Sequence, residues 1–352
     1  MFSLFSKNFN TKKGVLIREL FLLFCIILLS IQLFWEYKNI QNRYVSKEQI
    51  RLNEAVATEN DATTAEKKQE ANSSILYGKN VVCFGDSITF GQSSSSPDVS
   101  DNPWPQVLEE LTGAHVVNMG ICGSALAYDS IDTNSKLNRD SFVHRINNLD
   151  LSSYDYIFIA YGTNDLSYQI PIGENTDTEP YSFKGAINYS VDKLRNDYPD
   201  LHIVFVTPML DHRLDESYIN AIVEMSDIKD YEYIDMRCLG IKEDDFSDVY
   251  WDTMKSMHPN EATYYAMGAY ISKYPDCNDH QCHYINFDTQ GGYLLSKREI
   301  AVEGRKIGYL PITLKQGNEF DGWYTESGEL ITEDSIYDFD DDITLYAHFY
   351  SH

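Results

Sequence analysis

Basic residues are scarce in this sequence. Of its 352 residues, 28 are Lys or Arg against 54 Asp or Glu, which gives a formal net charge of −26. No Lys or Arg follows Lys315, although acidic residues continue as far as Asp342. A chain of this charge repels the phosphate backbone of nucleic acids. We therefore expect no nucleic-acid partner and favour neutral or cationic partners.

The sequence has only one long apolar run. Residues 20–35 read LFLLFCIILLSIQLFW, carry no charge and, extended by residues 15–17, are long enough for one membrane-spanning helix. A cleaved signal peptide would need small residues just after the run, which instead ends in Phe-Trp-Glu. We predict an N-terminal tail at residues 1–14 and a transmembrane anchor at residues 15–37.

Aromatic residues are missing from residues 45–74, where charges of both signs alternate with small polar residues. Such a stretch cannot bury a core. We therefore predict a linker or partly helical stalk over residues 38–74, with folded structure beginning near Ile75.

Strand-like and helix-like runs alternate from residue 75 to residue 276. This order predicts an α/β domain with a parallel sheet covered by helices on both faces. Ligands of such sheets bind beyond the carboxyl ends of the strands. The expected strands are 80–84, 114–118, 156–161, 202–207 and 231–235. The expected helices are 105–111, 141–149, 183–198, 216–228 and 260–273.

Small and polar residues gather where these expected strands end. Each group alone is typical of a turn, and a lone histidine is more often structural than catalytic. Taken together, they would meet at one edge of the sheet. In chain order they are Gly85-Asp86-Ser87, Asn118-x-Gly120-x-x-Gly123, Gly162-Thr163-Asn164-Asp165 and His258-Pro259-Asn260.

These four blocks in this order resemble the SGNH hydrolases, also called GDSL esterases, over about residues 75–275. The resemblance implies a flavodoxin-like three-layer α/β/α fold. No Gly-x-Ser-x-Gly sequence surrounds Ser87, so the ordinary α/β-hydrolase family is disfavoured.

The resemblance also implies roles for individual residues. Ser87 would be the nucleophile and His258 the base that removes its proton. The oxyanion would be stabilised by the backbone N–H groups of Ser87 and Gly120 and by the side-chain amide of Asn164. No cofactor or metal is expected.

One position departs from the family pattern. Members usually carry an acid three residues before the histidine, where this sequence has Lys255. The nearest acid is Asp252, six residues before His258, and we predict that it orients the imidazole. A displaced acid, a Ser-His dyad and a weakened enzyme all stay open.

The cysteines carry one further expectation. The sequence has six, and Cys277 and Cys282 would form a surface disulfide in an exported domain. With His280 and His283 a metal cluster is the alternative, but the spacing matches no zinc template.

Residues 283–352 change to short β-type runs separated by glycines. They resemble the Listeria-Bacteroides repeat, or internalin-type B repeat. This family occurs on exported bacterial surface proteins and has a compact, β-grasp-like form, which favours an outward orientation of the chain. The segments that carry the resemblance are Phe287-Asp288, Gly291-Gly292, Leu310-Pro311, Phe320-Asp321-Gly322-Trp323-Tyr324 and Thr344-Leu345-Tyr346-Ala347.

The resulting hypothesis is a single-pass, membrane-anchored serine esterase whose catalytic domain (residues 75–276) and repeat domain (residues 283–352) are extracellular. Its substrate would be a small acyl ester, most plausibly acetyl, on a carbohydrate or cell-wall polymer. An acyltransferase that uses the same acyl-serine is one alternative. A surface-binding or adhesion protein with little activity is another. The ligand of the repeat domain is left open.

Overall fold

The computed structural model describes most of the chain after residue 73. The predicted tail, the membrane anchor and all but the last residue of the stalk lie outside the described part, as do Asp252 and Lys255. No helix within the described part is long and apolar enough to cross a membrane. The described residues are 74–93, 99–129, 135–209, 216–239, 258, 259, 261–278, 281–292, 294, 297–315 and 317–351.

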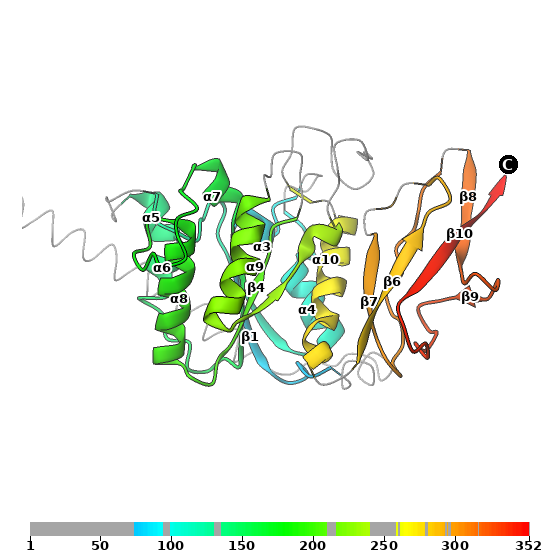
Figure 1. Ribbon diagram of the computed structural model, residues 1–352, viewed down its shortest axis with the longest axis horizontal. Helices are drawn as coiled ribbons and strands as arrows, with labels where there is room; N and C mark the ends of the chain where they lie inside the picture. Colours follow the sequence, from blue (N-terminus) through cyan, green and yellow to red (C-terminus); the bar gives the residue numbers. More distant parts are fainter. Residues whose placement is uncertain are drawn as a thin grey trace, which may run out of the picture. The chain divides into compact units, whose positions relative to one another are not determined.

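A five-stranded parallel sheet forms the centre of the first domain (Figure 1). The strands lie in the order β2-β1-β3-β4-β5, which is the flavodoxin-like order. The predicted α/β class and all five predicted strands are confirmed, and their ends differ from the prediction by two residues at most. The strands are β1 (Asn80–Gly85), β2 (His115–Gly120), β3 (Tyr156–Ala160), β4 (His202–Val206) and β5 (Glu232–Ile234).

Helices cover both faces of this sheet. Four of the five long predicted helices are confirmed, and they correspond to α4, α8, α9 and α10. The helices of the described part are α3 (Ser87–Phe90), α4 (Trp104–Thr112), α5 (Lys136–Asp140), α6 (Phe142–Arg145), α7 (Thr163–Ser167), α8 (Phe183–Asp197), α9 (Ser217–Lys229), α10 (Glu261–Lys273) and the 3₁₀ helices η1 (Met236–Leu239) and η4 (Pro275–Asn278).

The fifth prediction, one helix over residues 141–149, is confirmed only in part, because the helix in this range, α6, covers Phe142–Arg145 alone. Ser141 is extended, with φ −65° and ψ 150°, and separates α5 from α6, which ends at Arg145. Beyond that point the side chains of Asn147 and Asn148 donate to the carbonyls of Val143 and His144 at 2.8 Å. Asparagine competes in this way with backbone N–H groups for helical carbonyls, so its side chains favour turns over continued helix.

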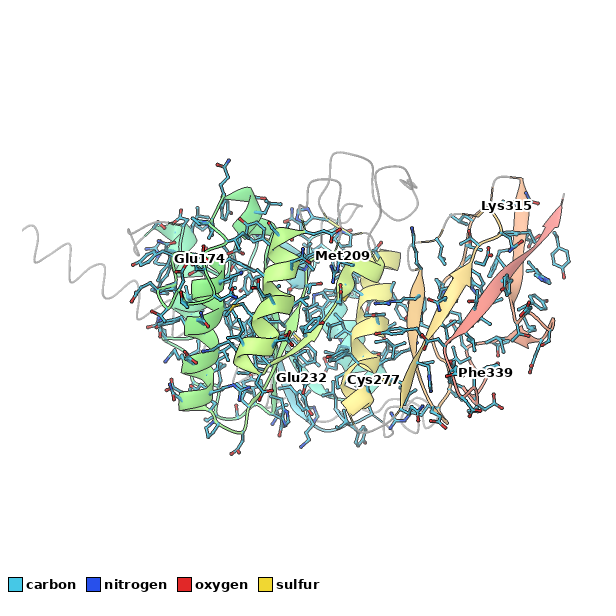
Figure 2. All side chains as sticks on the ribbon, in the orientation of Figure 1. Glu174, Met209, Glu232, Cys277, Lys315 and Phe339 are labelled. Atoms are coloured by element: carbon cyan, nitrogen blue, oxygen red, sulfur yellow. A yellow bond between two sulfur atoms is a disulfide. The ribbon has the colours of Figure 1, made fainter. Side chains whose placement is uncertain are left out.

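Side chains fill the space between the sheet and its helices (Figure 2). On one face, Val81 and Phe158 share a buried cluster with Trp104 of α4 and Met267 of α10. Helices α4 and α10 also touch each other closely, because a Cβ on Gly268 would lie 2.4 Å from Val107. Burying each large apolar side chain contributes about 1.5–3 kcal/mol. This packing holds α10, which begins next to His258, against the sheet.

The second sheet forms the predicted β-rich domain. Its order is β7-β6-β10-β8-β9, with β6 and β10 parallel and the other pairs antiparallel. A separate core surrounds Trp323, whose indole N–H donates to the Pro311 carbonyl at 2.7 Å. Core packing is therefore the role of this tryptophan. The strands are β6 (Cys282–Asp288), β7 (Arg298–Val302), β8 (Asn318–Tyr324), β9 (Leu330–Ile331) and β10 (Ile343–Ser351).

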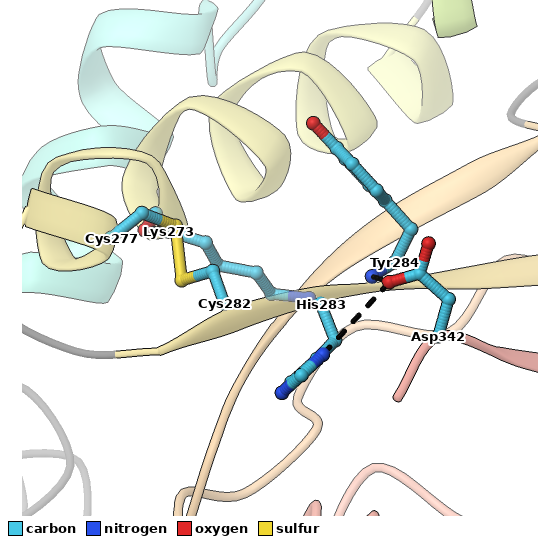
Figure 3. The surroundings of a disulfide bond; sticks show 6 residues. All are labelled: Lys273, Cys277, Cys282, His283, Tyr284 and Asp342. Carbon is cyan, nitrogen blue, oxygen red and sulfur yellow. Dashed lines mark hydrogen bonds and ion pairs between the residues drawn. A yellow bond between two sulfur atoms is a disulfide. The ribbon is translucent and has the colours of Figure 1, made fainter. Parts of the chain in front are cut away.

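The two domains are joined by a disulfide and a buried ion pair. Cys277 and Cys282 are bonded between η4 and β6 (Figure 3), as the sequence predicts for an exported domain. Near this bond the ammonium of Lys273, at the end of α10, lies 3.8 Å from the fully buried carboxylate of Glu299 on β7. Burial lowers the pKa of Lys273, and Glu299 opposes that shift. Each of these buried charges offsets the cost of removing the other from water, so losing either one is expected to destabilise the domain junction.

The variant Lys273→Met tests this dependence. It removes the ammonium that lies 3.8 Å from the buried Glu299 carboxylate, so we expect the free energy of unfolding to fall by about 3–5 kcal/mol. Adding Glu299→Gln neutralises the buried carboxylate and should recover part of the loss. Urea unfolding measures both changes.

The matched control is Lys193→Met, which breaks the more exposed pair between Lys193 and Asp197 at 2.7 Å. Such surface pairs contribute at most about 1 kcal/mol. Equal losses from the two lysine variants would contradict the importance of the buried pair.

Candidate active site

Ser87 lies where β1 passes directly into the short helix α3. Asp86 caps this helix, because its Oδ1 accepts a hydrogen bond from the Ile88 N–H at 2.8 Å. Gly91 ends it with a φ of 99°, a value that favours glycine, and donates its N–H to the Ser87 carbonyl. The half-buried serine is therefore held at the carboxyl edge of the sheet by a capped single turn.

The structure brings His258 to this serine. The Nε2 atom of His258 lies 2.8 Å from Ser87 Oγ, within hydrogen-bond distance. His258 and Pro259 come just before α10, which begins at Glu261. Because Asp252 lies outside the described residues, its role as the orienting acid stays a prediction.

Asn164 reaches the same edge from β3. Gly162, with a φ of 129°, precedes α7, and the side chain of Asn164 in the first turn donates to the Ser124 carbonyl at 3.0 Å. A carboxamide carries two N–H groups, so a second donor is left for a ligand. None of the hydrogen bonds found among the described residues uses the backbone N–H of Ser87.

Gly120 has a different environment from the one we expected. Its N–H donates to Asn118 Oδ1 at 2.9 Å, so this donor is already engaged. The Asn118 amide in turn donates to the Thr89 carbonyl at 2.7 Å, which ties the end of β2 to α3. A Cβ at position 120 would lie 2.2 Å from the Phe90 nitrogen. Glycine is needed at position 120 because α3 packs directly against it.

Gly123, three residues further on, has the properties that were expected of Gly120. Within the described ranges, no hydrogen bond uses its N–H. The Gly123 carbonyl accepts from the Tyr168 hydroxyl at 2.8 Å, and the adjacent Ser124 carbonyl accepts from Asn164. The sequence contained the signal, because Gly123 is the second glycine of the Asn-x-Gly-x-x-Gly block.

Two carboxyl groups are buried beneath the site. Burial and, to a smaller extent, the nearby Asp165 together raise the pKa of Asp86 to about 7, against hydrogen bonds from Ile88 and Thr89. Burial also raises the pKa of Asp165 to about 6, although its oxygens accept from the N–H groups of Leu126 and Ala127 at 3.0–3.1 Å. Asp165 therefore holds the loop that follows Ser124 against α7.

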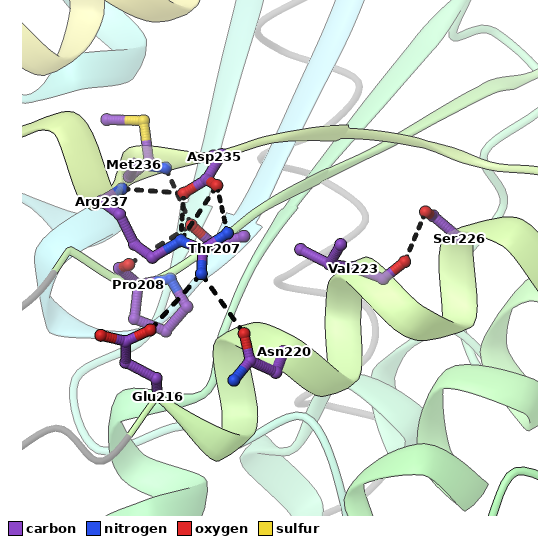
Figure 4. Close-up of polar contacts among 9 residues, drawn as sticks. All are labelled: Thr207, Pro208, Glu216, Asn220, Val223, Ser226, Asp235, Met236 and Arg237. Atoms are coloured by element: carbon purple, nitrogen blue, oxygen red, sulfur yellow. Dashed lines mark hydrogen bonds and ion pairs between the residues drawn. The ribbon is translucent and has the colours of Figure 1, made fainter.

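A small cavity of about 30 Å³ is lined by both sequence neighbours of Ser87, but not by Ser87, Asn164 or His258. One of its lining residues, Thr207, accepts a hydrogen bond from the Met236 N–H at 2.9 Å and so joins the ends of β4 and β5 (Figure 4). Most of the wall is apolar. The lining residues are Asp86, Ile88, Thr89, Trp104, Ala160, Tyr161, Thr163, Val206, Thr207, Pro208, Met209 and Met267.

The fold and this edge define an α/β protein with a flavodoxin-like sheet and a serine-histidine contact at its carboxyl end. Comparison of the sequence with known families makes the assignment specific. Residues 83–266 match the GDSL-like lipase/acylhydrolase family, and residues 283–348 match the Listeria-Bacteroides repeat domain. The chain belongs to the GDSL-like lipase/acylhydrolase family. This membership supports a hydrolase, and specifically an esterase.

Solved structures with a similar fold come from several organisms. A protein from Lactobacillus plantarum is 19% identical, with 57% of this chain and 98% of that chain covered and a TM-score of 0.47. A carbohydrate acetylesterase family member from Sinorhizobium meliloti is 22% identical, with 57% and 98% covered and a TM-score of 0.42. A carbohydrate esterase family 2 enzyme from Corynascus thermopiles is 23% identical, with 56% and 66% covered and a TM-score of 0.39. No curated protein matches the sequence.

The raised pKa of Asp86 predicts how stability depends on pH. Its pKa rises on folding from an ordinary value of 3.8 to about 7, so the folded state holds the proton more tightly than the unfolded state. The stabilisation from this proton is complete below about pH 4 and is lost as the pH rises through about 7. Asp86→Asn keeps an acceptor for the helix cap but does not titrate.

We therefore expect the variant to lose less stability than the wild type between about pH 4 and pH 7. Urea unfolding midpoints at several pH values in this window measure the difference. Parallel curves for the two proteins would show that Asp86 does not titrate in this range.

Proposed function

We propose that this protein is a serine esterase that hydrolyses small acyl esters, acetyl esters foremost, on a carbohydrate or cell-wall polymer. The observation that carries the proposal is the 2.8 Å contact between Ser87 Oγ and His258 Nε2. Both residues stand at the carboxyl edge of the sheet, and both belong to the segment that matches an acylhydrolase family.

In the first step His258 Nε2 removes the proton of the Ser87 hydroxyl as Oγ attacks the ester carbonyl carbon. A tetrahedral intermediate forms, and its former carbonyl oxygen carries a negative charge. Three donors are assigned to this oxygen, namely the N–H of Ser87, the free amide hydrogen of Asn164 and the N–H of Gly123. Gly123 replaces Gly120 in this assignment because the Gly120 N–H is bonded to Asn118.

Collapse of the intermediate breaks the bond to the alcohol, which leaves with the proton held by His258. The acyl group stays on Ser87 as an ester. Water then attacks this ester while His258 removes a proton from the water, and the carboxylic acid leaves as Ser87 regains its hydrogen. We propose Asp252 as the acid that orients His258 in both steps.

The choice of a small acyl group rests on the sequence, in which no large apolar segment suggests a tunnel for a lipid tail. An acetyl ester is for this reason proposed ahead of a lipid ester.

The location of the enzyme is part of the same proposal. Residues 15–37 would anchor the chain in the membrane and residues 38–74 would hold the catalytic domain outside. The charge-free apolar run supports the anchor. The disulfide between Cys277 and Cys282 supports an oxidising compartment. The polymer substrate and the membrane are the proposed partners.

The proposal predicts activity that depends on Ser87 and His258. The purified protein should release acetate from acetylated wall polysaccharide and cleave a chromogenic acetyl ester faster than the octanoyl ester. Ser87→Ala and His258→Ala should each lower kcat by roughly 10⁴-fold or more. An inert wild-type protein would contradict the proposal. Acyl transfer to an added alcohol that exceeds hydrolysis would instead identify an acyltransferase.

A second prediction concerns Asn164. Asn164→Ala removes one donor to the oxyanion, so kcat should fall by about 10²–10³-fold with little change in KM. The matched control is Asn147→Ala, which removes an amide bonded to the Val143 carbonyl away from the site. If the two variants had equal activity, Asn164 would not stabilise the oxyanion.

A further inference from the structure

Two hydrogen bonds connect the segment after Ser87 with the first turns of α10, the helix that follows His258. One joins Ser100 to Glu261 and the other joins Tyr264 to Gln92. Both link parts of the chain that are more than 160 residues apart in sequence. Like the contact between Ser87 and His258, both hydrogen bonds join residues 87–100 to residues 258–264.

The first connection runs through Tyr264. Its side chain is fully buried, and its hydroxyl donates to the Gln92 carbonyl at 2.7 Å. The N–H of Gln92 donates to the Ser87 carbonyl at 2.9 Å. Gln92 therefore links α10 to the backbone of Ser87 through two hydrogen bonds. Moving the Gln92 carbonyl away would leave the buried Tyr264 hydroxyl without this acceptor, which is destabilising. The hydrogen bond therefore holds the Gln92 carbonyl in position.

The second connection runs through Ser100. Its hydroxyl donates to Glu261 Oε2 at 2.8 Å, a bond that the carboxylate strengthens. The Ser100 N–H donates to the Gly91 carbonyl at 2.7 Å, and the Gly91 N–H donates to the Ser87 carbonyl at 3.0 Å. Both connections therefore end on the Ser87 carbonyl. Glu261 lies three residues after His258, at the start of α10.

We propose that the pairs Ser100–Glu261 and Tyr264–Gln92 form a clamp that sets the distance between Ser87 Oγ and His258 Nε2. This inference rests on the proposed function, in which these two atoms exchange a proton. Packing of α10 on α4 through Gly268 holds the middle of the helix. The clamp holds its first turns, so Ser100, Glu261 and Tyr264 are positioning residues for catalysis.

The test uses the full chain with Ser100→Ala, Tyr264→Phe and the double variant. A displacement of reacting groups by about 1 Å can lower a rate by about 10²-fold, so we expect kcat to fall roughly 10-fold in each single variant and about 10²-fold in the double variant. KM should stay within about 2-fold, because the substrate contacts are unchanged. Ser100→Thr and Glu261→Gln retain a donor and an acceptor and should restore most of kcat.

Matched controls remove similar groups elsewhere. Ser272→Ala deletes a hydroxyl bonded to the Ala269 carbonyl at the far end of α10. Tyr231→Phe deletes a buried hydroxyl bonded to the Ile222 carbonyl. Both controls should keep the kcat of the wild type. If they lowered kcat as much as the clamp variants, the clamp would have only a structural role and the inference would fail.

A crystal structure of the double variant provides a readout without activity. The clamp predicts that Ser87 Oγ and His258 Nε2 move apart from 2.8 Å. An unchanged distance together with an unchanged kcat would overturn the inference. Failure of the proposed function is a different result, namely a wild-type protein that neither cleaves acyl esters nor reacts with a fluorophosphonate at Ser87. In that case the crystal structure still decides whether the clamp sets the distance.

Discussion

The hydrogen bond between Ser87 and His258 is the interaction on which the site depends. It joins residues 171 positions apart in the sequence, which are brought into contact only by the folded sheet. Parallel strands place all their carboxyl ends at one edge, so the turn after β1, the loop after β2 and the helix after β3 meet there. His258 arrives at the same edge because α10 packs against α4 on the adjoining face.

The polar groups beneath this edge are arranged to hold loops rather than to carry charge. Asp86 caps α3, Asp165 binds the N–H groups after Ser124, and Asn118 joins β2 to α3. Burial of the two acids raises the pKa of each toward neutral pH. Their backbone hydrogen bonds oppose that shift. The loops that present Ser87 and Asn164 are therefore positioned by buried hydrogen bonds.

One helix connects the site to the repeat domain. Helix α10 begins three residues after His258 and ends at Lys273, whose ammonium lies 3.8 Å from Glu299 of the second sheet. The disulfide between Cys277 and Cys282 closes the short segment between that helix and β6. The repeat domain therefore packs on the helix that follows His258. The ion pair and the disulfide fix this junction, whereas a flexible linker would make no such contacts.

The sequence alone determined the strands, four long helices, the two domains and the blocks that meet at the site, because alternation of apolar residues and turn chemistry depend on near neighbours. Tertiary structure decided the rest. Only folding brings together the groups that make the packing of α3 on Gly120 and the buried pair of Lys273 with Glu299. Even the end of α6 at Arg145, which arises locally, follows from which carbonyls the side chains of Asn147 and Asn148 reach, and no periodicity records that.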